Sequence, residues 1–207
     1  MTSPAIVTAQ QFSALLAQRR STRDFEDTSI RLEQALAILT AGQGITGSEG
    51  QRAAPSAHRL YPLLLRLLAR NVQGLEPALY DYFPENNELK RAGELPAEGV
   101  LLDASLASDF WLEDAPCVVV ICANIKKAIE HFVEQDIEGQ QRGQRYVDFE
   151  AGAASQNMHL QSMMEDLGAI VVMGVNEQAL KVSLQLADDV EVVAALCVGH
   201  IPAHPLG

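Results

Sequence analysis

The most constraining feature of this chain is a long helical pattern, YVDFEAGAASQNMHLQSMMEDLG at 146–168, followed directly by the apolar run AIVVMGV at 169–175. Five side chains of the first segment recur at the spacing of one helix face: Ala153, Asn157, Leu160, Met164 and Leu167. Gly168 is placed to end the helix, and the run after it predicts a short strand. A long helix that leads straight into a strand indicates a domain in which helices cover a sheet.

The rest of the sequence alternates between helical and strand-like patterns. Further helices are predicted over 8–20, 30–42, 126–138 and 177–187, the first capped by Thr8 and the second stopped by Gly42. Further strands are predicted over 117–125 and 190–201. The leucine-rich run 60–70 fits a helix by propensity, although Tyr61-Pro62 and the later ALYDYF are compatible with paired strands. The glycine-rich stretch 42–59 predicts a long loop, and the polar stretch 84–99 predicts turns.

This order of elements predicts an α+β fold rather than a doubly wound parallel sheet, because two helices are adjacent near the N-terminus and strands are few. The 207 residues suit one domain, 1–207, and a hydrophobic content of 48% supplies a sizeable core. The balance of 15 basic against 27 acidic residues argues against broad contact with nucleic acid or an anionic membrane.

The cysteines and the N-terminal residues bear on the compartment. Cys117, Cys122 and Cys197 are an odd number without zinc spacing, and all lie in apolar runs, so we expect buried, reduced thiols. The N-terminal residues lack the pattern of a signal peptide, and the apolar runs are too short to cross a membrane. We therefore expect a cytoplasmic protein.

Against a formal net charge of -12, the segment RRSTRDF at 19–25 places three arginines within five positions. One interpretation is a solvated surface patch after a helix, and the other is an anion clamp. The planar fork of arginine matches a phosphate group, and a serine hydroxyl can add a hydrogen bond. If the segment is extended, Arg19, Ser21 and Arg23 point to the same side, so a terminal phosphate is the ligand that it would suit.

No other nucleotide or catalytic motif competes with this segment. There is no P-loop, and Gly42, Gly44 and Gly47 follow a helix rather than a strand. The five histidines form no metal-ligand pattern, and Ser56 lacks the context of a nucleophile elbow. We therefore predict no side-chain catalyst and no metal site.

Four segments, taken in order, resemble the FMN-dependent nitroreductase superfamily: RRSTRDF at 19–25, AAPSAHRLYPL at 53–63, APCVVVICAN at 115–124, and FEAGAASQNMHLQSMMEDLGAIVVMGV at 149–175. The second, followed by GLEPALYDYFPENNEL at 74–89, is similar to the SagB-type dehydrogenase branch. The resemblance covers nearly the whole chain. It implies a three-layer sandwich with a central, mostly antiparallel sheet flanked by helices, in a domain-entwined homodimer, and it favours a strand over 60–70.

The resemblance also implies a cofactor, FMN, bound at the subunit interface. The matching positions are Arg19, Arg20, Ser21 and Arg23 at the phosphate, Pro55, Ser56 and Ala57 reaching the flavin from the partner subunit, and Met173, Gly174 and Val175 against the isoalloxazine ring. A backbone N–H of that last turn commonly faces flavin N5. Asn157, on the helix expected at the dimer core, is better explained as a satisfied buried amide.

The activity that the resemblance implies is ping-pong hydride transfer. NAD(P)H reduces the flavin at N5, and a small electron-poor acceptor, such as a nitro, quinone or conjugated compound, takes the electrons; dehydrogenation of a small substrate is the related possibility.

Two departures from the family pattern keep alternatives open. No Lys or Arg follows Lys181, whereas relatives often carry a basic pair after the last strand that touches the phosphate. This leaves open a flavin-binding or degenerate, non-catalytic subunit. Glu138 and Gly139 stand where peptide azoline oxidases carry Lys-Tyr, which argues against oxidation of peptide thiazolines. A flavin-consuming or dehalogenating relative is the third possibility.

Overall fold

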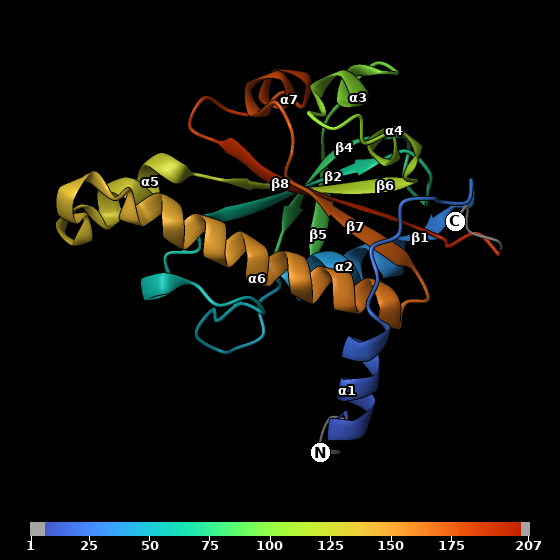
Figure 1. Cartoon of the computed structure of the whole chain (residues 1–207), viewed down its shortest axis with the longest axis horizontal. Helices are drawn as coiled ribbons and strands as arrows, with labels where there is room; N and C mark the ends of the chain where they lie inside the picture. Colours follow the sequence, from blue (N-terminus) through green and yellow to red (C-terminus); the bar gives the residue numbers. More distant parts are fainter. Residues whose placement is uncertain (1–6, 204–207) are drawn as a thin grey trace.

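The computed structural model describes residues 7–203. The first residues of the N-terminal segment that was compared with a signal peptide, and His204, lie outside this range. A six-stranded antiparallel sheet, in the order β5-β4-β2-β6-β8-β7, forms the centre (Figure 1). Its strands are β2 (Leu63–Ala69), β4 (Ala78–Phe83), β5 (Glu88–Gly93), β6 (Cys117–Ala123), β7 (Gly168–Val172) and β8 (Glu191–Gly199). Two short parallel strands, β1 (Ile30–Arg31) and β3 (Val72–Gln73), pair beside it.

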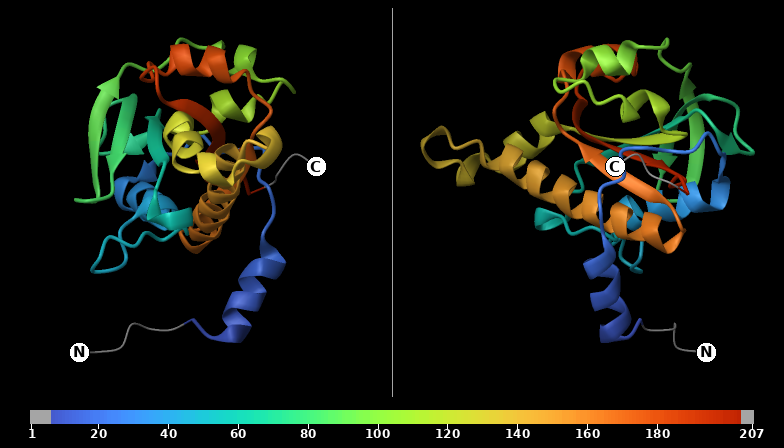
Figure 2. Two further views of the ribbon diagram at one scale, coloured as in Figure 1. Left: turned by 90° about the vertical axis from the view of Figure 1, so that its left-hand side faces the viewer. Right: turned by 45° about the vertical axis from the view of Figure 1, so that its right-hand side comes forward.

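Helices cover both faces of this sheet (Figures 1 and 2). On one face lie α2 (Leu32–Gln43) and the long α6 (Arg142–Met164), which pack over one hydrophobic core. On the other face α3 (Val100–Ala104), α4 (Trp111–Asp114) and α7 (Glu177–Ser183) cover a second core. The expected three-layer α+β sandwich with an antiparallel sheet is therefore confirmed.

The central strands are apolar along their length because both of their faces are covered. Every residue of β6 is buried. Val119 and Ile121 face the core under α2 and α6, whereas Val118 and Val120 face the opposite core. This is the pattern expected of a strand buried on both sides.

The leucine-rich run at 60–70 is a strand, as the resemblance favoured. β2 pairs with β4 on one side and with β6 on the other. Its side chains alternate: Leu63, Leu65 and Leu67 enter one core, while Leu68 enters the other. Leucine has a high helix propensity, but two-sided pairing with neighbouring strands overrides this weak local preference.

The clearest differences from the sequence prediction concern three segments. The stretch 84–99 is not only turns, because β5 forms within it and pairs with β4. The helix predicted over 126–138 is the shorter α5 (Ile125–His131), followed by 3-10 turns at Val133–Gln135 and Ile137–Gly139. Gly168 does not end α6, which stops at Met164, but begins β7.

The buried face of α6 is not the repeat that predicts the helix. The side chains under the helix are Val147, Ala151, Ala154 and Met158. Of the predicting repeat, Asn157 and Leu160 are only partly buried and Met164 is 60% exposed. Gly42 of α2 explains the close packing on the buried side, since a Cβ at that position would lie 2.7 Å from the Met158 sulfur. The helix therefore carries a second, half-exposed apolar stripe.

The first helix, α1 (Ala9–Gln18), projects away from the rest of the protomer (Figures 1 and 2). Thr8 caps it as expected, and Gln11 completes a capping box. None of its residues is buried, and Phe12 and Leu16 are 48% and 44% exposed. The apolar side of α1 is thus uncovered within one protomer.

The packing of β2 leads to a stability prediction. Leu67 is fully buried in the core beneath α2 and α6, so Leu67→Ala should lower the free energy of unfolding by about 2–5 kcal/mol. Val182, on α7, is 69% exposed, and Val182→Ala should change it by less than about 0.5 kcal/mol. Denaturant titration followed by circular dichroism measures both. Equal midpoints for the two variants would contradict the assignment of Leu67 to the core.

Candidate functional site

The arginine-rich segment lies along the edge strand β7. The Thr22 N–H donates to the Ala169 carbonyl (3.0 Å), and Ser21 and Ala169 form a parallel bridge. Gly168 allows this approach, because a Cβ there would lie 2.5 Å from the Thr22 hydroxyl. On α6, the buried His159 donates from Nε2 to the Arg20 carbonyl (3.0 Å), which can only accept. The backbone of 20–22 is thereby held between the long helix and the sheet.

Two of the three arginine side chains of this segment have contacts within the chain. Arg20 folds back and donates to the Ala17 and Arg19 carbonyls at the end of α1. The Arg23 guanidinium lies over the Trp111 ring, 5.7 Å from its centroid. Within residues 7–203, none of the three arginines has a carboxylate within 4.0 Å. In a strongly acidic chain, this segment therefore keeps its positive charge available to an external anion.

The loop that carries Pro55, Ser56 and Ala57 is attached to α6. The Ala57 N–H donates to Oε1 of Glu150 (2.8 Å), and Asn157 donates to the Ala53 carbonyl (3.3 Å), which satisfies one side of its amide. Ser56 accepts a hydrogen bond from the Tyr61 N–H at 2.9 Å. These contacts hold the loop against the helix.

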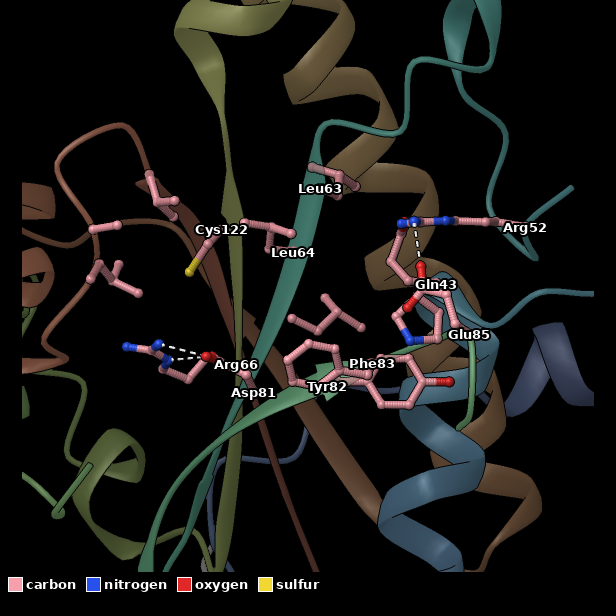
Figure 3. A pocket seen from close by; sticks show the side chains of 15 residues that line it. Gln43, Arg52, Leu63, Leu64, Arg66, Asp81, Tyr82, Phe83, Glu85 and Cys122 are labelled. Atoms are coloured by element: carbon pink, nitrogen blue, oxygen red, sulfur yellow. Dashed lines mark hydrogen bonds and ion pairs between the residues drawn. The ribbon is translucent and has the colours of Figure 1, made fainter. Parts of the chain in front are cut away.

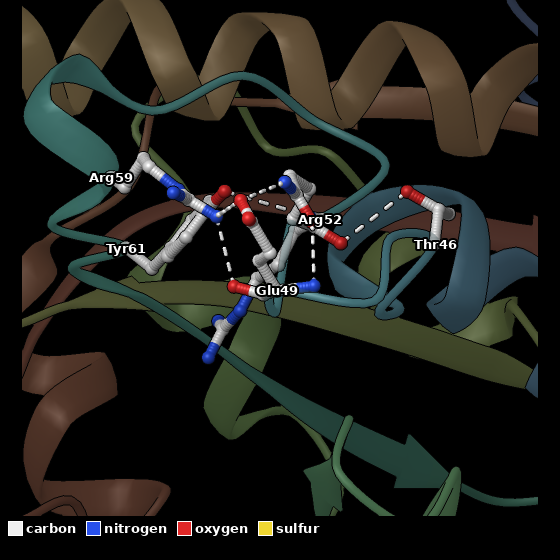
Figure 4. Close-up of polar contacts among 6 residues, drawn as sticks. Thr46, Glu49, Arg52, Arg59 and Tyr61 are labelled. Atoms are coloured by element: carbon white, nitrogen blue, oxygen red, sulfur yellow. Dashed lines mark hydrogen bonds and ion pairs between the residues drawn. The ribbon is translucent and has the colours of Figure 1, made fainter.

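The same loop is cross-linked within itself and has a strained backbone. Arg59 donates to the Glu49 carbonyl (2.8 Å), and the Arg52 N–H donates to the Tyr61 hydroxyl (3.3 Å), as Figure 4 shows. His58, Arg59 and Tyr61 all have positive φ, at 53°, 58° and 47°, which is uncommon for residues with bulky side chains. Strained backbone that the surroundings enforce occurs frequently at binding sites.

Glu150 is the buried acid of this region. Burial raises the pKa of its carboxyl above the ordinary value of 4.5, and hydrogen bonds from Ala57 and Ser56 partly oppose that rise. His159 shows the corresponding effect for a base, because burial lowers the pKa of its imidazole below 6.5. The neutral imidazole keeps a proton on Nε2, which it donates to the backbone carbonyl of Arg20.

The turn after β7 presents free backbone to the outside. The Gly174 carbonyl accepts from the Leu106 N–H (2.7 Å), and Val175 donates to the Met173 carbonyl (2.9 Å). Across the described residues, no hydrogen bond uses the Gly174 N–H. A Cβ at Gly174 would meet no atom within 4 Å, so the space beside this donor is open in one protomer.

A hollow of about 230 Å³ lies next to this turn, between α6 and the β7-β8 edge of the sheet. Its walls include Ala151, Gly152 and Ser155 of α6, and Val171 and Met173 from β7 and its turn. Three small residues on the helix therefore leave room beside Met173, the first residue of the turn.

Within one protomer, the segments predicted to bind the cofactor attach to opposite faces of α6. Glu150 holds the 53–57 loop and His159 holds the 19–23 segment. Nine residues of helix correspond to about two and a half turns and about 13 Å along the axis. No hydrogen bond joins the two segments in the described part of the chain. The 19–23 segment and the 173–175 turn, in contrast, both border β7.

Sequence reasoning missed the residues that position these segments, namely Glu150, His159, Gly168 and Trp111. Glu150 lies on the buried side of the long helix, where a carboxylate requires partners, but the sequence alone does not say which of the two apolar stripes is buried. For His159, Gly168 and Trp111 the contacts come from elements far apart in the sequence. The buried Nε1 of Trp111 has no hydrogen-bond partner among the residues that the structure describes.

The remaining expectations concern thiols, metals and membranes. Cys117, Cys122 and Cys197 are free and buried as predicted, and burial raises the pKa of the first two thiols to about 12 and that of the third further. Between residues 7 and 203, no group of three His, Cys, Asp or Glu side chains could hold a metal ion. No helix in the same range is long and apolar enough to span a membrane.

The buried carboxyl of Glu150 predicts a specific pH dependence. Because its folded pKa is raised, its contribution to stability is full below pH 4.5 and is lost as the pH rises through the folded value. Glu150→Gln keeps the acceptor for Ala57 and removes this titration. Relative to the unaltered chain, the variant should gain free energy of unfolding as the pH rises above 4.5. The exposed Glu88→Gln is the control, and the same pH trend in both variants would contradict the prediction.

Comparison with known proteins identifies the family of this chain and supports its fold. The family model for the nitroreductase family matches residues 16–200. A protein of Methanocaldococcus jannaschii that is provisionally assigned as a nitroreductase, MJ1384, is 32% identical over 158 residues, which are 76% of each chain. A crystal structure of a provisionally assigned nitroreductase from Ralstonia eutropha superposes with a TM-score of 0.72 at 25% identity, over 99% of this chain and 89% of that one. A similar assignment from Anabaena variabilis superposes at 0.75 and 21% identity, over 93% of this chain but 38% of that longer one. The chain therefore belongs to the nitroreductase family, and its general activity is that of an oxidoreductase.

Proposed function

We propose that this protein is a homodimeric, FMN-dependent oxidoreductase that moves a hydride from NAD(P)H through flavin N5 to a small electron-poor acceptor. Nitro compounds, quinones and conjugated substrates are the acceptor classes, with dehydrogenation of a small substrate as the related reaction. The segments 53–63 and 74–89 support a place in the SagB-type branch. The observation that carries the proposal is the group of arginines without carboxylate partners that borders β7.

The donors along β7 fit a phosphate. Arg19, Ser21 and Arg23 lie on one segment, whose backbone is fixed by Ala169 and His159. The guanidinium groups of Arg19 and Arg23 are not paired with any carboxylate that the structure describes. Arginine held on a fixed backbone binds phosphate with charge-assisted hydrogen bonds at little cost in backbone entropy. We assign the FMN phosphate to these residues. Arg20 lies beside them and donates to the Ala17 and Arg19 carbonyls at the end of α1.

The other end of the same edge suits the isoalloxazine ring. The Gly174 N–H is an exposed donor, and the hollow beside Met173 is lined by small residues of α6. From Ala169 to Met173 the strand advances by about 13 Å, which leaves room for a ribityl chain between phosphate and ring. Bound FMN supplies the hydride-accepting N5 atom, and the chain supplies orientation and the hydrogen bond from Gly174. The adjoining turn residue Val175 is buried and fixes the turn to the sheet layer.

A second copy of the chain is needed to complete this site. Pro55, Ser56 and Ala57 lie on a loop attached to the face of α6 opposite the arginine segment, which supports their approach to the flavin from a partner subunit. The protomer also leaves apolar side chains uncovered on α1 and α6: Phe12, Leu16, Phe149 and Met164 are between 44% and 74% exposed. Exposed apolar faces of this extent are typical of subunit interfaces.

An exposed apolar side chain near the turn bears on the substrate, and the cysteines bear on the compartment. Leu106, whose N–H donates to the Gly174 carbonyl, is 73% exposed and offers an apolar surface to a flat acceptor beside the 173–175 turn. Three buried free cysteines fit a reducing compartment, which supports a cytoplasmic location.

The first test is the flavin itself. The purified protein should be yellow or take up added FMN, and NADH or NADPH should bleach it under anaerobic conditions. Arg23→Ala should weaken FMN binding by roughly 1.5–3 kcal/mol, because one charge-assisted hydrogen bond is lost. Arg91→Ala, at an exposed arginine on β5, is the matched control and should bind FMN unchanged.

The results separate the candidate functions. A colourless protein that does not bind FMN would favour the degenerate subunit, and FMN binding without bleaching would favour a non-catalytic flavin protein. Destruction of the flavin during turnover would favour the flavin-consuming relative. An Arg23→Ala dissociation constant equal to that of the unaltered chain would remove Arg23 from the phosphate site.

The second test asks whether the site is shared between subunits. One variant, Arg19→Ala with Arg23→Ala, damages the phosphate segment, and another, Pro55→Trp, adds bulk at an exposed loop position. Each homodimer should bind FMN poorly. Heterodimers formed by mixing should regain one intact site, built from the undamaged segment of each chain. Recovery of FMN binding on mixing is the expected result, and no recovery despite confirmed heterodimers would mean that each site lies within one chain.

A further inference from the structure

A cavity opens at the other end of the sheet, where β2 and β4 separate. Their pairing runs from Ala69↔Ala78 to Arg66↔Asp81 and then stops, so Leu63–Leu65 have no partner on β4. The wedge between the strands opens into a space of about 400 Å³ (Figure 3). This volume is within the range of sites that bind small molecules.

One side of this cavity is apolar. Leu64 of β2 and Phe83 of β4, which are 50% and 37% exposed, line it together with Cys122, Leu186 and Val190. In Figure 3, Leu64 and Cys122 lie on the same side of the strands. These residues come from β2, β4, β6 and the segment between α7 and β8, so the wall is built by the tertiary fold. It offers a surface for an aromatic or branched aliphatic body.

A closed ion pair forms the floor. Arg66 donates to both carboxylate oxygens of Asp81, at 2.7 and 3.0 Å, and its remaining nitrogen donates to the Leu184 carbonyl. All three nitrogens of Arg66 are therefore engaged, and the pair is neutral toward a ligand.

Arg52 is different, because its donors are mostly unused. Its side chain is only 16% exposed and rests on the Tyr61 ring, 4.9 Å from the centroid. One nitrogen donates to the Gln43 side chain at 2.9 Å. Its nearest carboxylate, Glu85, is 3.9 Å away and 62% exposed, which is too far for a hydrogen bond. A largely buried guanidinium thus faces the cavity with one side-chain partner among its five donor hydrogens.

We propose that this cavity is a binding site for a small amphipathic carboxylate, separate from the proposed cofactor site. The ligand carboxylate takes the position beside Arg52 that Glu85 approaches but does not fill, and its apolar body lies against Leu64 and Phe83. The physical reason is that a partly desolvated arginine gains most from a bidentate planar anion, and the neighbouring wall removes apolar surface from water. The site shares no residue with the 19–23 segment, the 55–57 loop or the 173–175 turn.

The test uses the full chain saturated with FMN and two probes of the same shape, 2-naphthoate and its neutral analogue 2-naphthamide. Isothermal titration calorimetry should show 2-naphthoate binding at least about tenfold more tightly, the factor expected for one charge-assisted hydrogen bond. Arg52→Gln should remove this preference. Glu85→Gln should leave or increase the affinity for 2-naphthoate, because it removes a competing carboxylate.

Two further variants keep the test decisive if Arg52→Gln disturbs the loop. Leu64 is half exposed, so Leu64→Trp should fill the cavity without unfolding the sheet and should weaken both probes by at least about tenfold. Arg91→Gln, at an exposed arginine outside the cavity, should change neither. The proposal is overturned if 2-naphthoate does not bind to the FMN-saturated chain, if it binds no better than the amide, or if Leu64→Trp has no effect.

Discussion

The structure depends on the packing of α6 against the sheet and against two segments, 19–23 and 53–57, that bind to the helix. A long helix buried on one side must satisfy the polar groups that it takes out of water, and Glu150 and His159 do so by binding backbone groups of two distant segments. The packing of α6 therefore fixes more than the core. It also decides where the 53–57 loop and the 19–23 segment lie, and it keeps them on opposite faces.

This arrangement separates, within one chain, the segments assigned to the proposed cofactor site. The arginine segment and the 173–175 turn share the edge of β7, whereas the loop with Pro55 lies behind the helix. The same protomer exposes the apolar side of α1 and a half-exposed stripe on α6. A shared site at a subunit interface, as proposed, accounts for both observations with a single cause, since the surface that buries these residues would also bring the loop of the partner to the flavin.

The two ends of the sheet treat their arginines differently. At the β2-β4 end, Arg66 is neutralised by Asp81 in a two-point ion pair. Arg52 at the same end, like the arginines beside β7, keeps donors that the described chain does not use. In an acidic protein, a cation without a partner is conspicuous, because carboxylates are abundant and desolvated charge is costly. Both proposed sites rest on this contrast.

Much of the architecture was readable in the sequence. Periodicity predicted α6, α2 and α1, and the buried β-branched run predicted β6, because these signals are local. Propensity misjudged β5, whose polar residues sit on a solvent-facing edge strand, and left β2 undecided until strand pairing could be considered. The repeat that predicted α6 is not the stripe that faces the sheet, and a helix with two apolar stripes does not reveal which one is buried.

The candidate site, too, could be predicted from the sequence only in part. The sequence by itself determined the charge of RRSTRDF, the small residues of α6 and the glycine of the 173–175 turn, because these are properties of residue type and spacing. Only the tertiary structure decided that His159 and Gly168 hold the arginine segment beside β7, that Glu150 holds the loop on the other face, and that β2 and β4 separate over a cavity. The contacts of His159 and Glu150 join residues about a hundred positions apart or more, and no local pattern encodes such distances.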